Sequence, residues 1–165
     1  MKWNVEENKV DYIKLMHESG KAMGVQFAKP TVELQTAVIE EARRYNKPVV
    51  AHALSLEDQL EVLSAGVNGL THAFYDQPLT AEVVAAYKKN NAWLNPTLAA
   101  VGSLTTEGQS IAEKYAHDPR VQDKVDGQGR SNLCRCMDFH GENSRWEYAI
   151  QTVVELKKAG IDIIW

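Results

Sequence analysis

The sequence predicts a parallel α/β architecture, a partial TIM-type (β/α)8 barrel with about five strands and flanking helices. Short apolar or β-branched runs alternate with amphipathic helix patterns, which is typical of parallel strands joined by right-handed crossovers. In addition, segment 47–76 contains one unit twice. Each copy is a strand pattern that ends in a histidine and an alanine, first at His52 and then at His72.

The first strand is expected at residues 10–16. Side chains alternate along a strand, so Tyr12, Lys14 and Met16 share one face, where Lys14 interrupts an apolar run. A lysine that guards an edge strand is the alternative interpretation of this position. His17 follows the strand directly and precedes a glycine-containing loop.

Two amphipathic helices follow. The first is expected over 32–45, because Thr31 is a suitable N-cap. The second is expected over 56–65, between the cap Ser55 and the terminating Gly66. The expected core positions are Leu34, Val38, Ile39 and Ala42 in the first helix and Leu56, Leu60 and Leu63 in the second.

The alternation continues with a third strand at 67–71. A helix then opens at Thr80 and ends near residues 90–91. The fourth strand, 92–95, is closed by Pro96.

The last third of the chain is less regular. Residues 97–143 break into short helical pieces, and a long excursion after a strand suggests a lid over a substrate. Ser144 starts a capping-box signature, and the helix behind it ends at Gly160. Residues 161–165 are expected to form a final strand. We interpret the whole chain as a single domain.

Composition bears on the possible partners of the protein and on its location. The net charge is −4 without a long basic run, which argues against nucleic acid partners. No apolar stretch approaches the roughly 18 residues of a spanning helix, so we expect no membrane partner. Cys134 and Cys136 are too close in sequence for an ordinary disulfide framework. A cytoplasmic location is therefore expected.

The two strand-end histidines are the strongest candidate site. The carboxyl ends of neighbouring parallel strands meet at one edge of a sheet, where ligands bind, so His52 and His72 should face one site. Either histidine alone would more commonly be a hydrogen-bonded core residue. Their repetition at equivalent positions, with Lys14 in register, favours metal ligands.

These residues resemble a known family. Lys14 in DYIKLM, His52 in PVVAHA, His72 in GLTHAFYD and the strand-plus-proline WLNPTL are similar to the metal-dependent amidohydrolases, specifically the imidazolonepropionase-like and Xaa-Pro dipeptidase-like members. The resemblance implies barrel strands four to eight, with Lys14 as a carboxylated, metal-bridging lysine and His52 and His72 as metal ligands. It implies one or two divalent metals, expected to be zinc, and hydrolysis of an amide or other C–N bond of a small-molecule substrate by metal-activated water.

The sequence also departs from that family. It contains no His-x-His pair, and the catalytic aspartate expected after the last strand is absent, so no catalytic residue is assigned. His17 and Tyr75 are candidate substrate-binding residues, against ordinary loop roles for both. The alternative function is a catalytically inactive half-barrel fragment, incomplete at both ends. Such a fragment would form a homo-oligomer through its open barrel edges or require a missing complement.

Overall fold

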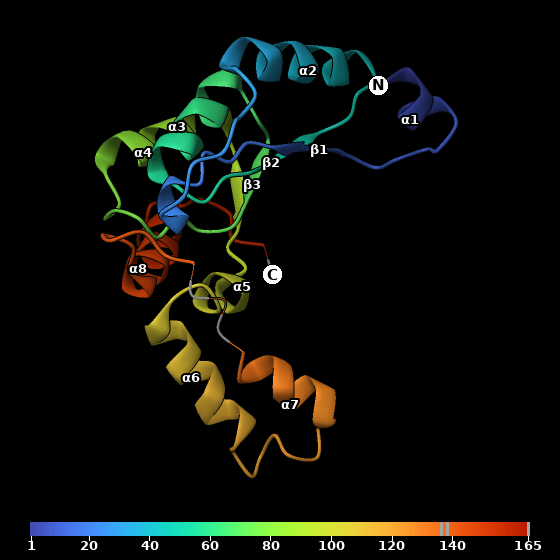
Figure 1. Ribbon diagram of the computed structural model, residues 1–165. Coiled ribbons are helices and arrows are strands. Elements are labelled where there is room, and N and C mark those ends of the chain that lie inside the picture. The colour runs from blue at the N-terminus through green and yellow to red at the C-terminus, as the bar shows by residue number, and fades with distance from the viewer. Residues whose placement is uncertain (136, 138, 165) are drawn as a thin grey trace.

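The computed structural model describes residues 1–135, 137 and 139–164 (Figure 1). Four parallel strands form one sheet in the order β1-β2-β3-β4. Each strand lies beside the one that precedes it in the chain, which is the arrangement of a barrel wall. The predicted partial barrel is confirmed. The strands are β1 (Ile13–Met16), β2 (Val49–His52), β3 (Gly69–Thr71) and β4 (Trp93–Asn95).

Helices connect and cover these strands. α2, α3 and α4 pack against one another in chain order, whereas α6 and α7 extend away from the sheet (Figure 1). No helix in the described part of the chain is both long and apolar enough to cross a membrane. The helical segments are α1 (Lys2–Glu6), the 3-10 turn η1 (Lys21–Met23), α2 (Val32–Arg44), α3 (Leu56–Ala65), α4 (Ala81–Asn90), α5 (Leu98–Gly102), α6 (Thr106–Ala116), α7 (Gly127–Leu133) and α8 (Trp146–Lys158).

The predicted caps position the first two long helices. The Thr31 hydroxyl accepts a hydrogen bond from the Leu34 N–H at 3.3 Å, and Ser55 accepts one from the Asp58 N–H at 3.1 Å. Gly66 ends α3 in the left-handed region, with φ 96°. These local signals fix where β2 ends and α3 begins, and therefore where His52 lies.

The core face of α2 differs from the prediction at one position. Leu34 is 56% exposed, whereas its neighbour Gln35 is 2% exposed. The Gln35 amide donates to Nδ1 of the buried His17 at 3.0 Å. Because of this bond, the side of α2 that carries Gln35 faces the core. The predicted core positions Ile39 and Ala42 are fully buried.

Among its described residues, the segment between β4 and α8 contains the short helical pieces that were predicted for 97–143, namely α5, α6 and α7. The predicted cap at Ser144 is wrong. The N-cap of α8 is Arg145, and the Ser144 hydroxyl instead donates to the Ala22 carbonyl at 2.6 Å. This bond joins the start of α8 to the loop after β1.

The expected fifth strand, 161–165, is reduced among the described residues to one parallel bridge between Ile163 and Leu94. Its predicted direction is correct, although its extent is not. Trp165 and Cys136 lie outside the described residues.

One face of the sheet is buried beneath helices and the other is open. Leu15 is buried, whereas Lys14, Tyr12 and Met16 are exposed, as the predicted alternation requires. The open face carries a hollow of about 360 Å³ whose lining includes Lys14 and Thr71. In a closed barrel this face would be the interior.

Candidate metal centre

The structure brings the three predicted metal-binding residues together. His52 is the last residue of β2, and His72 immediately follows β3. Their ring centroids are 4.7 Å apart, and the rings meet edge to face at 78°. The Lys14 amino group donates to the hydroxyl of Thr71, the residue before His72. Parallel pairing of β1, β2 and β3 thus gathers Lys14, His52 and His72 at one end of the sheet.

Each histidine has one ring nitrogen engaged and one free. His52 Nε2 lies 3.0 Å from Glu18 Oε2, and His72 Nδ1 is hydrogen-bonded to Thr97 Oγ1. Among the described residues, neither His52 Nδ1 nor His72 Nε2 has a hydrogen-bond partner. Metal-binding histidines use one nitrogen for the metal and the other for an orienting hydrogen bond. The two histidines therefore fit a divalent metal.

Burial keeps His72 in the protonation state that a metal requires. Desolvation, together with the nearby charges of His52 and Lys14, lowers the pKa of His72 to about 4. The ring is consequently neutral near pH 7. Because only neutral imidazole binds a metal, His72 requires no deprotonation there.

Lys14 also departs from an ordinary surface lysine. The residue is exposed overall, but partial burial of its side chain lowers the pKa of its amino group. No carboxylate in the described residues pairs with Lys14; its hydrogen-bond partner is the Thr71 hydroxyl. Both features make the neutral amine, the form that could be carboxylated, easier to reach than in a surface lysine that is paired with a carboxylate.

The backbone beside this centre is strained. His72 has φ 79° and Thr97 has φ 45°, although neither is a glycine. Such conformations cost on the order of 1–3 kcal/mol each and cluster at functional sites. The two strained residues hydrogen-bond to each other, and the His72 N–H donates to the Asn95 carbonyl at 2.8 Å. The turn after β3 and the turn after β4 thus jointly orient the His72 ring.

His17 does not belong to the candidate metal centre. It is fully buried, and its ring nitrogens contact Gln35 at 3.0 Å and Glu61 Oε2 at 2.6 Å. Its side chain therefore lies on the helix-covered side of the sheet, with no surface to offer a substrate. The expected contact between His17 and a substrate has no support from this position and stays a prediction. The physical reason is alternation, because His17 is an odd number of positions from Lys14 and points to the opposite face.

Tyr75 is also fully buried. Its hydroxyl donates to the Phe139 carbonyl at 3.0 Å, and burial, aided by the negative charges of Glu18 and Asp76, raises its pKa. In this structure Tyr75 has a structural role, and its predicted contact with substrate stays a prediction. Tyr75 ties the long excursion to the turn that follows His72.

Sequence reasoning missed a charged cluster beside His17. Lys29 Nζ lies 2.7 Å from Asp58 Oδ1 and 2.5 Å from Glu61 Oε2. The ligand atoms of His17, Asp58 and Glu61 lie within 4.8 Å of one another, a spacing that could hold a metal ion. The Lys29 ammonium already supplies a cation between the two carboxylates, so we interpret this cluster as a buried ion-pair network. No sequence signal joins these residues, because Lys29 lies in an irregular loop.

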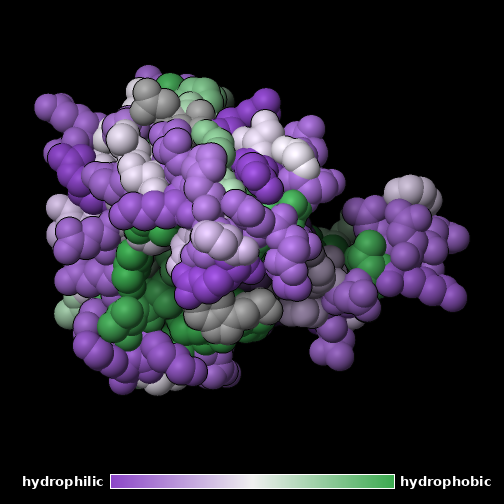
Figure 2. Space-filling view, turned by 90° about the horizontal axis from the view of Figure 1, so that it is seen from below, coloured by the Kyte–Doolittle hydropathy of each residue, from purple (hydrophilic) through white to green (hydrophobic). Residues whose placement is uncertain are grey.

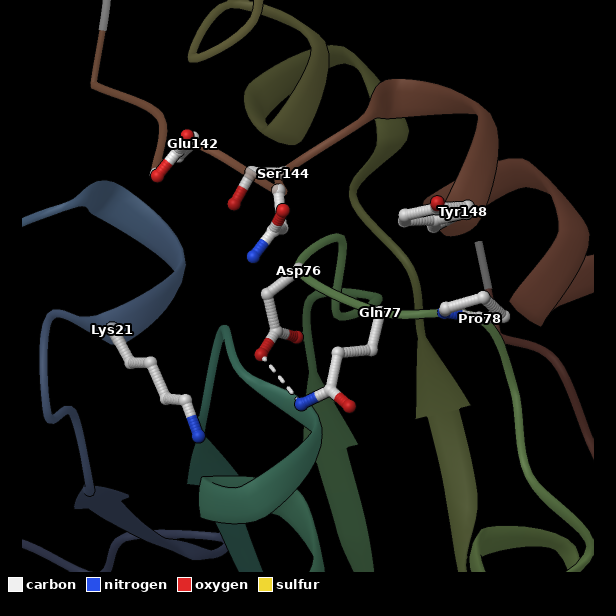
Figure 3. Close-up of a pocket in the computed structure, with 9 residues that line it drawn as sticks. Lys21, Asp76, Gln77, Pro78, Glu142, Ser144 and Tyr148 are labelled. Atoms are coloured by element: carbon white, nitrogen blue, oxygen red, sulfur yellow. Dashed lines mark hydrogen bonds between the residues drawn. The ribbon is translucent and has the colours of Figure 1, made fainter.

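A separate pocket of about 500 Å³ lies between η1, the turn after β3 and the start of α8. Figure 3 shows the Lys21 and Asp76 side chains pointing into the same space from opposite walls. Asp76 Oδ1 accepts from the Leu56 N–H at 2.9 Å, and burial raises the pKa of this carboxyl. None of Lys14, His52 and His72 lines this pocket, so it is distinct from the candidate metal centre.

Comparison with known proteins gives structural matches only. No family model and no curated protein matches the sequence. A Xaa-Pro dipeptidase with bound methionine in its active site matches with TM-score 0.58 and 19% identity, over 95% of this chain and 34% of that one. Ochratoxinase from A. niger matches with TM-score 0.61 and 19% identity, over 95% and 31% of the two chains. Molinate hydrolase matches with TM-score 0.58 and 17% identity, over 96% and 29%.

The chain has the fold of part of an amidohydrolase. This fold likeness agrees with the resemblance carried by Lys14, His52 and His72. The chain spans about a third of the length of the solved amidohydrolase-like structures that it matches. At 17–19% identity the likeness is one of fold.

Proposed function

We propose that this chain carries part of the metal site of a hydrolase that cleaves an amide or other C–N bond of a small substrate. One observation carries the proposal: His52 and His72 lie side by side, each with one ring nitrogen hydrogen-bonded and the other without a partner among the described residues. Catalytic metal sites use about three protein ligands and leave a position open for water. Lys14 is the proposed third ligand after carboxylation, as the amidohydrolase resemblance implies.

Zinc is the proposed metal, because imidazole nitrogen is among its usual ligands. When bound, a divalent metal would activate a water molecule and polarise the scissile carbonyl. The residues of this chain prepare the site. Burial keeps His72 neutral, and the Thr71 hydroxyl holds the Lys14 amine beside the two rings. The hollow on the open face is lined by Lys14 but not by the two histidines, and we propose it as the place for the small substrate because it adjoins the centre through Lys14 and Thr71.

Hydrolysis of a chromogenic amide tests the proposal. Any hydrolysis of an N-acyl nitroanilide by the zinc-loaded protein should be abolished by a chelator and by His72→Ala. His117→Ala is the matched control, because His117 is exposed and follows α6 rather than a strand. Activity that survives both the chelator and His72→Ala would refute the proposed chemistry.

A second candidate function follows from the open face. Tyr12 and Met16 on this face are 53% and 59% exposed, and β1 is an edge strand. The face of the molecule seen from below in Figure 2 also carries hydrophobic residues beside hydrophilic ones. Exposed strand edges and apolar patches recruit partners. We propose that a second copy of this chain covers the open face. Light scattering should then give a dimer that Met16→Lys dissociates, whereas a monomeric wild type would exclude it.

A further inference from the structure

Glu18 connects the first two strand ends. It follows β1 by two residues, and its side chain is 11% exposed. Its Oε1 accepts from the Gly20 N–H at 2.7 Å, and its Oε2 accepts from the Leu54 N–H at 3.2 Å. The same Oε2 lies 3.0 Å from His52 Nε2. One carboxylate therefore binds the loop after β1, the loop after β2 and a candidate metal ligand.

The chemistry of these contacts fixes the His52 ring. An ionised carboxylate can only accept hydrogen bonds, so the proton of neutral His52 must reside on Nε2. The lone pair is then left on Nδ1, the nitrogen without a partner among the described residues. The hydroxyl of Thr97, by contrast, can donate or accept and does not impose a tautomer on His72.

The surrounding loop holds the carboxylate in place. Gly20 has φ 81°, and a Cβ there would lie 2.6 Å from the Val25 carbonyl oxygen. Ser19 donates to Asp58 through its N–H at 3.0 Å and through its hydroxyl at 2.6 Å. The backbone on both sides of Glu18 is thus constrained. Fixed rotamers in the residues that support a ligand are what keep a metal site in its productive geometry.

We propose that Glu18 is a positioning residue, which holds His52 in the Nε2-protonated tautomer and presents Nδ1 to the metal. This inference rests on the proposed metal site. It adds a residue outside the ligand set implied by the amidohydrolase resemblance. Orienting carboxylates of this kind typically change metal affinity about 10–100-fold.

The test begins with metal-free protein labelled with ¹⁵N at histidine, at a pH well above the ordinary histidine pKa of about 6.5. Long-range ¹H–¹⁵N correlation spectra should show wild-type His52 protonated on Nε2. In Glu18→Gln the Nδ1-protonated form should appear, and zinc affinity measured against a competing chelator should fall about 10–100-fold. Glu57→Gln is the matched control, since Glu57 pairs with Lys21 at 2.7 Å at the same end of the sheet.

The outcomes are separable. Wild-type His52 protonated on Nδ1, or an unchanged tautomer in a folded Glu18→Gln, would overturn the role of Glu18. The wild-type spectrum alone shows which nitrogen of His52 is protonated, even if Glu18→Gln does not fold. Expected tautomers in a wild type that binds no zinc would support the positioning contact but refute the proposed function. A Glu57→Gln variant that shifts His52 equally would also overturn the inference.

Discussion

The lowered pKa of His72 predicts a pH-dependent stability that one substitution removes. Its pKa falls from 6.5 to about 4 on folding, so the unfolded chain binds this proton more tightly. The contribution of His72 to the free energy of unfolding is therefore complete above about pH 6.5 and is lost as pH falls towards about 4. At about pH 4.5 this corresponds to a loss of at most about 2 kcal/mol relative to pH 7, because His72 is partly exposed and solvent screens its interactions.

His72→Asn is the suitable perturbation, because asparagine does not titrate and tolerates the φ of 79° at this position. The assay is urea unfolding of metal-free wild type and variant between about pH 4.5 and 7. Between these limits, the free energy of unfolding should fall further in wild type than in His72→Asn, by on the order of 1–2 kcal/mol. Groups distant from His72 titrate alike in both proteins, so the difference reports His72 together with its electrostatic coupling to His52 and Lys14. Equal pH dependence in the two proteins would refute the account of its burial.

Three further substitutions test other contacts. Lys29→Met should cost about 3 kcal/mol in urea unfolding, because it leaves the fully buried Asp58 without its cation; a loss below about 0.5 kcal/mol would contradict the ion-pair interpretation. Tyr75→Phe should cost about 1 kcal/mol and speed hydrogen exchange around Phe139, since it removes their hydrogen bond; unchanged exchange would show that this bond does not anchor the excursion. Gly20→Ala should lower the melting temperature, because a Cβ would lie 2.6 Å from a backbone oxygen; an unchanged temperature would argue against a rigid loop.

Much of the fold could be predicted because its signals are local. The caps Thr31, Ser55 and Thr80 act within three residues, and each accepts the expected backbone hydrogen bond. Parallel pairing then places the ends of β2 and β3 together, so the proximity of His52 and His72 follows from their positions in two equivalent units.

The wrong predictions concern residues whose burial or hydrogen bonding depends on partners far away in the sequence. Gln35 is buried because it bonds His17, which a helical pattern does not reveal. Ser144 bonds the Ala22 carbonyl, 122 positions away, instead of capping α8. Tyr75, whose contact with substrate stays a prediction, is likewise buried by the excursion that folds back over it, and its partner Phe139 is 64 positions away. Spacing in the sequence places side chains on a face but does not identify what covers that face.

The most direct test of the central claim is the zinc content of protein purified without chelator, compared with His52→Ala/His72→Ala. The account predicts about one zinc per wild-type chain, none in the double variant, and an unchanged content in His117→Ala. Zinc retained by the double variant, or none in wild type, would contradict the assignment of the two strand-end histidines as a metal site.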